Sequence, residues 1–175
     1  MVYWGDVLAQ MTMGNLCQPS TVMLTRSAVE LAGSFDERMH PGEDDDYHLK
    51  VARVTHAALL NTVTCDYRVG SADQLTQPEH LVTIAENYVS ILSRGVAEDR
   101  VRLELPAPMI ARRLGEAHRW LGRELLERDR HAPARTALLG AMRHAPSMRT
   151  AAKLLLSCLP VNMKRALLHA RRRTR

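Results

Sequence analysis

Four successive carboxylates, Glu43 to Asp46, are the feature that most constrains how this chain folds. They follow the turn pair Pro41-Gly42, and the apolar residues after them recur at helical spacing. The acids are therefore predicted to lie where a loop becomes a helix. One interpretation is purely structural, because carboxylates in a first helical turn meet the partial positive charge of unpaired backbone N–H groups.

Size and composition indicate a globular protein. The chain has 175 residues, of which 46% are hydrophobic and 25% charged, while aromatic residues make up only 4%. Its three cysteines are far apart and form no Cys-x-x-Cys pair, which argues against a disulfide framework or a zinc knuckle. No apolar run approaches the roughly 18 to 20 residues of a membrane span, and the N-terminal residues do not resemble a signal peptide. We expect a cytoplasmic protein.

Charge divides the sequence into two regions. Residues 1–75 hold ten acids and five Lys or Arg, a balance of −5, whereas residues 76–175 hold nine acids and nineteen Lys or Arg, a balance of +10. Two regions of opposite sign predict two domains with different roles.

The first region has the pattern of an α/β fold. Residues 2–13 are spaced as one short amphipathic helix, and residues 21–25 have the apolar, β-branched profile of a buried strand. A brief helix is predicted over residues 27–32, ended by Gly33. After the acidic run and its helix, residues 57–69 are rich in strand formers and are predicted to be one extended strand.

Three motifs in this region resemble the family 2 glycosyltransferases. The first runs from Cys17 through Ser-Thr-Val-Met, an arginine and a short helix to Gly-Ser-Phe-Asp-Glu37. The second, Gly42-Glu-Asp-Asp-Asp-Tyr-His-Leu-Lys50, resembles the family's Gly-Glu-Asp-Tyr-Asp-Leu-Trp-Leu-Arg run, and Asp66-Tyr-Arg-Val-Gly-Ser71 resembles its Tyr-Arg-Val-His-x-Gly-Ser ending. The resemblance covers about residues 10–75 and implies the acceptor-side part of a GT-A fold.

The resemblance also implies roles for the acidic run. Such an enzyme transfers a sugar, with inversion, from a nucleotide-sugar donor to a hydroxyl of a glycan, lipid-linked or protein acceptor. By position, Asp44 is the general base that accepts the proton of the attacking hydroxyl. Glu43 is expected to contact the acceptor or orient the loop, and Asp46 to cap the helix or hydrogen-bond within it. His48 and Lys50 stand at acceptor-pocket positions where the family has tryptophan and arginine.

The sequence departs from the family in ways that limit the assignment. Asp45 replaces an apolar or aromatic residue, and the histidine expected between Val69 and Gly70 is absent. The family's nucleotide-binding strands and Asp-x-Asp metal motif belong to a region of about one hundred residues before this one. We therefore expect an incomplete enzyme, inactive alone, whose complete form uses Mg²⁺ or Mn²⁺; we expect no metal at Asp44 to Asp46 despite their suitable chemistry.

The second region is predicted to be helical. Helices are expected over about residues 78–94, closed by Gly95, over 110–128, and from Pro133 to before Pro146. The last two resemble one tetratricopeptide repeat, because small and apolar residues from Leu121 to Pro146 fall at its signature offsets, although an ordinary helical hairpin explains them equally well. Further helices are predicted over residues 151–159 and 161–170.

The basic C-terminus leaves two interpretations open. Met163, Leu167 and Leu168 accompany six Lys or Arg in residues 161–175, a composition that suits an anionic membrane surface, but a frayed basic tail has the same composition. Nucleic acid is not expected as a partner, because no aromatic residues interleave with the arginines. The alternative to a transferase is a non-catalytic helical scaffold that binds a partner protein.

Overall fold

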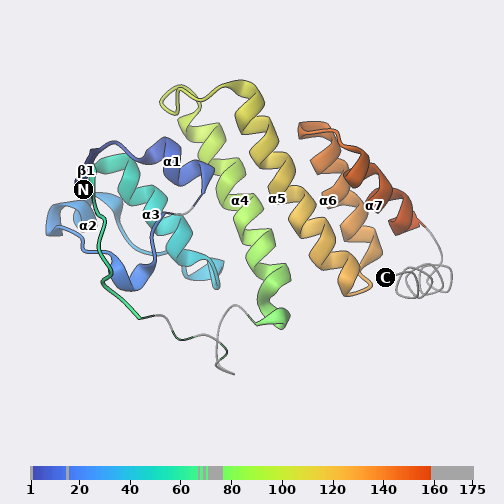
Figure 1. Cartoon of the computed structure of the whole chain (residues 1–175), viewed down its shortest axis with the longest axis horizontal. Helices are drawn as coiled ribbons and strands as arrows, with labels where there is room; N and C mark the ends of the chain where they lie inside the picture. Colours follow the sequence, from blue (N-terminus) through green and yellow to red (C-terminus); the bar gives the residue numbers. More distant parts are fainter. Residues whose placement is uncertain (1, 15, 67, 69, 71–76, 159–175) are drawn as a thin grey trace. The chain divides into compact units, whose positions relative to one another are not determined.

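The computed structural model describes residues 2–14, 16–66, 68, 70 and 77–158 (Figure 1). The chain divides into two compact units, Met1–Ile110 and Ala111–Arg175. The predicted domain boundary at residue 75 lies within residues 71–76, which are outside the described residues. The helix predicted over residues 161–170 also lies outside them. In chain order the strands and α-helices are β1 (Val2–Gly5), α1 (Leu8–Met13), α2 (Arg26–Ala32), α3 (Glu43–Val54), β2 (Ala57–Leu60), α4 (Leu81–Asp99), α5 (Ala107–Glu127), α6 (His131–His144) and α7 (Met148–Cys158).

The prediction of an α/β fold is wrong, and with it the GT-A-like fragment expected over residues 1–75; the prediction of a helical second region is confirmed in part. The described residues are mostly helical, and their one sheet is the antiparallel pair of β1 and β2, in which Val2 is opposite Leu60 and Gly5 opposite Ala57. Residues 2–13 form a strand and then a helix, and the strand predicted over residues 57–69 is confined to β2.

The strand predicted over residues 21–25 does not form in this structure. A 3₁₀ turn, η1 (Pro19–Thr21), precedes an extended segment that pairs with no other described strand, and Met23 in that segment is 97% exposed. Composition favours a strand here, but a strand also needs a hydrogen-bonded neighbour.

A compact apolar cluster holds the first unit together. It joins residues of α1, α3, α4 and the loops before α3 and after α4: Val7, Leu8, Met11, Met39, Leu49, Ala52, Ile91 and Leu103. Helix α3 contacts α1, α2 and α4, so the helix that begins with the acidic run lies at the centre of this unit. Gly95 does not end α4, which continues to Asp99, because a single glycine weakens a helix interior by only about 1 kcal/mol.

In the second unit, small residues allow α5 and α6 to approach closely. A Cβ added to Gly115 would lie 2.6 Å from the Cβ of Ala145, and one added to Gly122 would lie 2.7 Å from the side chain of Leu138. The predicted packing positions of α6 are buried, with Ala134, Leu138 and Ala141 fully covered. Helix α7 packs on α6. No helix of the described residues combines the length and apolar composition needed to cross a membrane.

We predict opposite effects of Gly→Ala at two helical positions. Gly115→Ala should lower the stability of the second unit by about 1–3 kcal/mol, because its methyl group meets Ala145 and the backbone of Ala141. Gly95→Ala should stabilise the first unit by about 0.5–1 kcal/mol, because its nearest neighbours lie 3.9 Å away. Urea unfolding of both variants, followed by circular dichroism, measures the difference; equal effects would contradict the close approach at Gly115.

Candidate functional site

The start of α3 places the acidic run on an ordered loop-to-helix junction. Gly42, the residue before the helix, has φ of +117°, a conformation that residues with a Cβ atom rarely adopt. The Glu43 side chain folds back, so that its Oε2 accepts the N–H of Gly42 at 2.9 Å and its Oε1 lies 3.0 Å from Nδ1 of His40. Partial burial acts to raise the pKa of Glu43, but hydrogen bonds from its own backbone N–H, from His40 and from the N–H of Gly42 outweigh it, and the pKa lies below its usual value.

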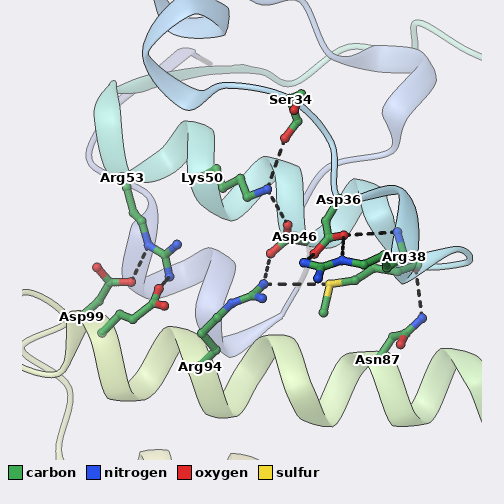
Figure 2. Close-up of polar contacts among 11 residues, drawn as sticks. Ser34, Asp36, Arg38, Asp46, Lys50, Arg53, Asn87, Arg94 and Asp99 are labelled. Carbon is green, nitrogen blue, oxygen red and sulfur yellow. Dashed lines mark hydrogen bonds and ion pairs between the residues drawn. The ribbon is translucent and has the colours of Figure 1, made fainter.

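Asp46 is the buried member of the run. Only 2% of its side chain is exposed, and its carboxylate pairs with Arg94 of α4 and, at 2.9 Å, with Nζ of Lys50 (Figure 2). Lys50 also donates to the backbone carbonyl of Ser34 at 3.2 Å. Within its own helix Asp46 forms an ion pair with the residue one turn further along, which is not the predicted cap, and no hydrogen bond within the described residues reaches its Oδ2. Lys50, predicted to bind an acceptor, connects Asp46 to the preceding loop.

The loop before α3 is fixed by a residue that sequence analysis missed. The side-chain amide of Asn87, on α4, donates to the backbone carbonyls of Met39 at 3.0 Å and of Pro41 at 2.8 Å. Figure 2 shows Asn87 reaching this loop from α4. Like Arg94, Asn87 lies more than forty residues from its partners. Helical periodicity places both residues on α4 but gives no sign of which loop they hold.

Asp44 and His48 form the second feature of the site. Asp44 is half-buried, and among the residues that the structure describes no hydrogen bond or ion pair holds its carboxylate. His48 lies one helical turn later, is 92% buried, and has no hydrogen-bond partner for Nδ1 within the described residues. Burial lowers the pKa of His48 below its usual value, and the nearby Asp44 carboxylate partly opposes that shift. A carboxylate without a structural partner is thus placed beside a buried neutral imidazole.

The carboxylates of α3 do not assemble into a metal site. No group of three or more His, Cys, Asp or Glu side chains converges within the described ranges. Glu43 and Asp46 are committed to His40 and to two cations, respectively, and Asp45 interacts electrostatically with Cys17. These neighbours do not fit a bound Mg²⁺ or Mn²⁺, which needs several oxygen ligands directed at one point.

An open depression lies elsewhere on the first unit, with a volume of about 340 Å³. Its lining is rich in hydroxyl and amide groups, from Gln18, Thr21, Thr62 and Thr64, together with Val63 and Cys65. Such groups donate and accept hydrogen bonds without carrying charge. Its exposed lining is nevertheless more apolar than polar, so the depression does not define a class of ligand.

Comparison of the chain with models of known protein families, with curated proteins and with solved structures gives no match. The resemblance to family 2 glycosyltransferases and the roles of Glu43, Asp44, His48 and Lys50 therefore stay predictions.

We predict that Arg94→Met destabilises the first unit by about 1–3 kcal/mol, because Asp46 stays buried and loses one of its two cations. This loss of stability is smaller than for a fully buried ion pair, because the Arg94 side chain is 35% exposed and solvent screens its charge. Arg38→Met is the matched control: it also removes an arginine that pairs with an aspartate, but that arginine is 89% exposed and little change is expected. Urea unfolding measures both, and similar losses would contradict the structural role of Asp46.

We also predict that His48 makes the first unit less stable in mild acid. Because its pKa is lowered on folding, the unfolded chain binds more protons than the folded one between the folded pKa and the usual value of 6.5. Stability should therefore rise with pH through this window and its His48 contribution should be complete above it. His48→Gln should flatten the profile between about pH 5 and 7, whereas the exposed His56→Gln should not. Urea unfolding across this range provides the test, and an unchanged slope in His48→Gln would contradict it.

Proposed function

We propose that residues 1–75 are the acceptor-side part of an inverting, family 2-like sugar transferase, with Asp44 as general base. The observation that carries the proposal is the state of the Asp44 carboxylate, for which the described residues provide no hydrogen bond or ion pair. Glu43 and Asp46 are engaged in contacts that hold the loop and the helix. Asp44 therefore has a carboxylate available for an external hydroxyl.

In this proposal Asp44 accepts the proton of an acceptor hydroxyl as its oxygen attacks the anomeric carbon of the donor sugar. The hydroxyl oxygen forms the new glycosidic bond, the bond to the nucleotide phosphate breaks on the opposite face, and the proton ends on Asp44. Burial lowers the pKa of His48, which disfavours a cation beside Asp44 that would weaken its basicity. Glu43 shapes the loop through His40 and Gly42.

The nucleotide-sugar donor and its Mg²⁺ or Mn²⁺ are assigned to polypeptide outside residues 1–75, because the acids of α3 do not fit a metal. Glycan, lipid-linked and protein acceptors all present a hydroxyl, and Asp44 would accept the proton of each in the same way.

We predict that Asp44→Asn, made in the full-length product of the natural gene, lowers sugar transfer by about 10²–10⁴-fold, the range typical of general-base catalysis. Its melting temperature should fall only slightly, because the interaction lost is that of a first-turn carboxylate with the partial positive charge of the helix start. Asp45→Asn, in the same helical turn, is the matched control and should retain transfer. Release of nucleoside diphosphate from a panel of nucleotide-sugars measures the activity. Turnover by Asp44→Asn at the wild-type rate would rule out the base assignment.

The alternative is a non-catalytic helical scaffold, and the helical character of the described residues favours it. A scaffold predicts that the full-length wild-type protein releases no nucleoside diphosphate from any donor and that Asp44→Asn changes nothing. The same assay therefore separates the two functions.

A further inference from the structure

Helix α7 has its polar and apolar sides reversed relative to an ordinary surface helix. Its most buried residues are polar: Thr150 is fully covered and Ser157 is 2% exposed. Its outward residues are apolar, with Met148 86%, Leu155 70% and Leu156 39% exposed. Met148, Ala152, Leu155 and Leu156, which recur at steps of three, four and seven residues, are called the outer face of α7 below.

Specific hydrogen bonds fix this orientation. The hydroxyls of Ser147 and Thr150 share a hydrogen bond of 2.8 Å, and the Ser147 hydroxyl accepts the backbone N–H of Thr150 at 3.2 Å. At the other end, Arg135 of α6 donates to the backbone carbonyl of Ser157 at 3.2 Å. The Ser147–Thr150 bonds lie within the start of α7 and do not depend on its rotation. The bond from Arg135, together with one from Nη1 of Arg119 on α5 to the Ser147 hydroxyl at 3.5 Å, holds α7 against its neighbours with the apolar side outward.

The sequence around α7 is basic, and the two acids of α5 that act on α7, Glu124 and Glu127, act on Lys153, which by helical spacing lies on the side of Thr150 and Ser157. Residues 130–175 contain eleven Lys and Arg and no Asp or Glu. Arg149, which is exposed, precedes Leu156 by seven residues and so lies on the same side of α7. An exposed apolar face within a stretch that lacks acidic side chains is complementary to a surface that is apolar inside and negatively charged outside.

We infer that the outer face of α7 binds an anionic lipid surface, with Met148, Leu155 and Leu156 entering the boundary between headgroups and acyl chains. Apolar contact and attraction to acidic headgroups together account for binding of this kind. A nucleic acid would use the cations but not the aliphatic side chains. The inference concerns α7 alone and does not depend on the proposed transferase activity.

Co-sedimentation of the full chain with vesicles tests the inference. Wild-type protein should bind phosphatidylcholine vesicles that contain phosphatidylglycerol, and bind pure phosphatidylcholine vesicles only weakly. The double variant Met148→Ser/Leu155→Ser should bind the anionic vesicles at least about tenfold more weakly, because two inserting side chains are lost. Its remaining binding, which depends on charge alone, should disappear at high salt. The matched control is Met23→Ser/Leu31→Ser, which removes two residues of the first unit that are 97% and 68% exposed and should bind as the wild type does.

Three results would overturn the inference. One is equal vesicle binding by the wild type and the Met148→Ser/Leu155→Ser variant. A second is a loss of stability of that variant, without vesicles, well above the roughly 0.5 kcal/mol per site that the lower helix propensity of serine explains, since it would show that the outer face is already covered in the free protein. The third is binding of a single-stranded RNA more tightly than the anionic vesicles, which would identify the basic region as a nucleic-acid site.

Discussion

The buried carboxylate of Asp46 is the interaction on which the first unit depends. It joins α3 to α4 through Arg94 and joins α3 to the preceding loop through Lys50 and the carbonyl of Ser34. A charge this deeply buried is costly without partners, so α3 is held in one position relative to both neighbours. Asn87 adds a second attachment from α4 to the same loop.

This anchoring explains how four adjacent acids come to differ. Successive residues of a helix point about 100° apart, so fixing Asp46 toward Arg94 determines the direction of the other three. Glu43 then reaches back to Gly42, and Asp44 is directed away from these partners, one turn before His48. The ion pairs of Asp46 thus determine where the Asp44 carboxylate lies. The chemistry proposed for Asp44 therefore requires the Asp46 contacts to be intact.

Local signals predicted the helices of this chain better than they predicted its sheet or its site contacts. The helix that follows Gly42, and the helices that became α5 and α6, have strong periodicity and turn or proline signals at their ends. The strand over residues 21–25 was predicted wrongly because strand formation depends on a neighbour that a local pattern cannot supply. For the site, the sequence indicated where the acids lie, but their partners Arg94 and Asn87 are on a helix far along the chain. Only the family resemblance distinguished Asp44 from Asp46, because no local pattern in the sequence indicates the partners that commit Asp46.

Helix α7 is oriented differently from what its sequence periodicity predicts. Its apolar residues have the spacing of a core-facing stripe, and periodicity alone would direct them inward. In the structure Thr150 and Ser157 face inward, with their hydroxyls bonded within α7 itself, to Ser147 and to the carbonyl of Leu154. Arg119 and Arg135 attach the two ends of α7 to α5 and α6, and the leucines are left for a surface outside the described residues. An acid-free basic sequence around them makes an anionic lipid boundary the surface that matches both their hydrophobicity and their charge.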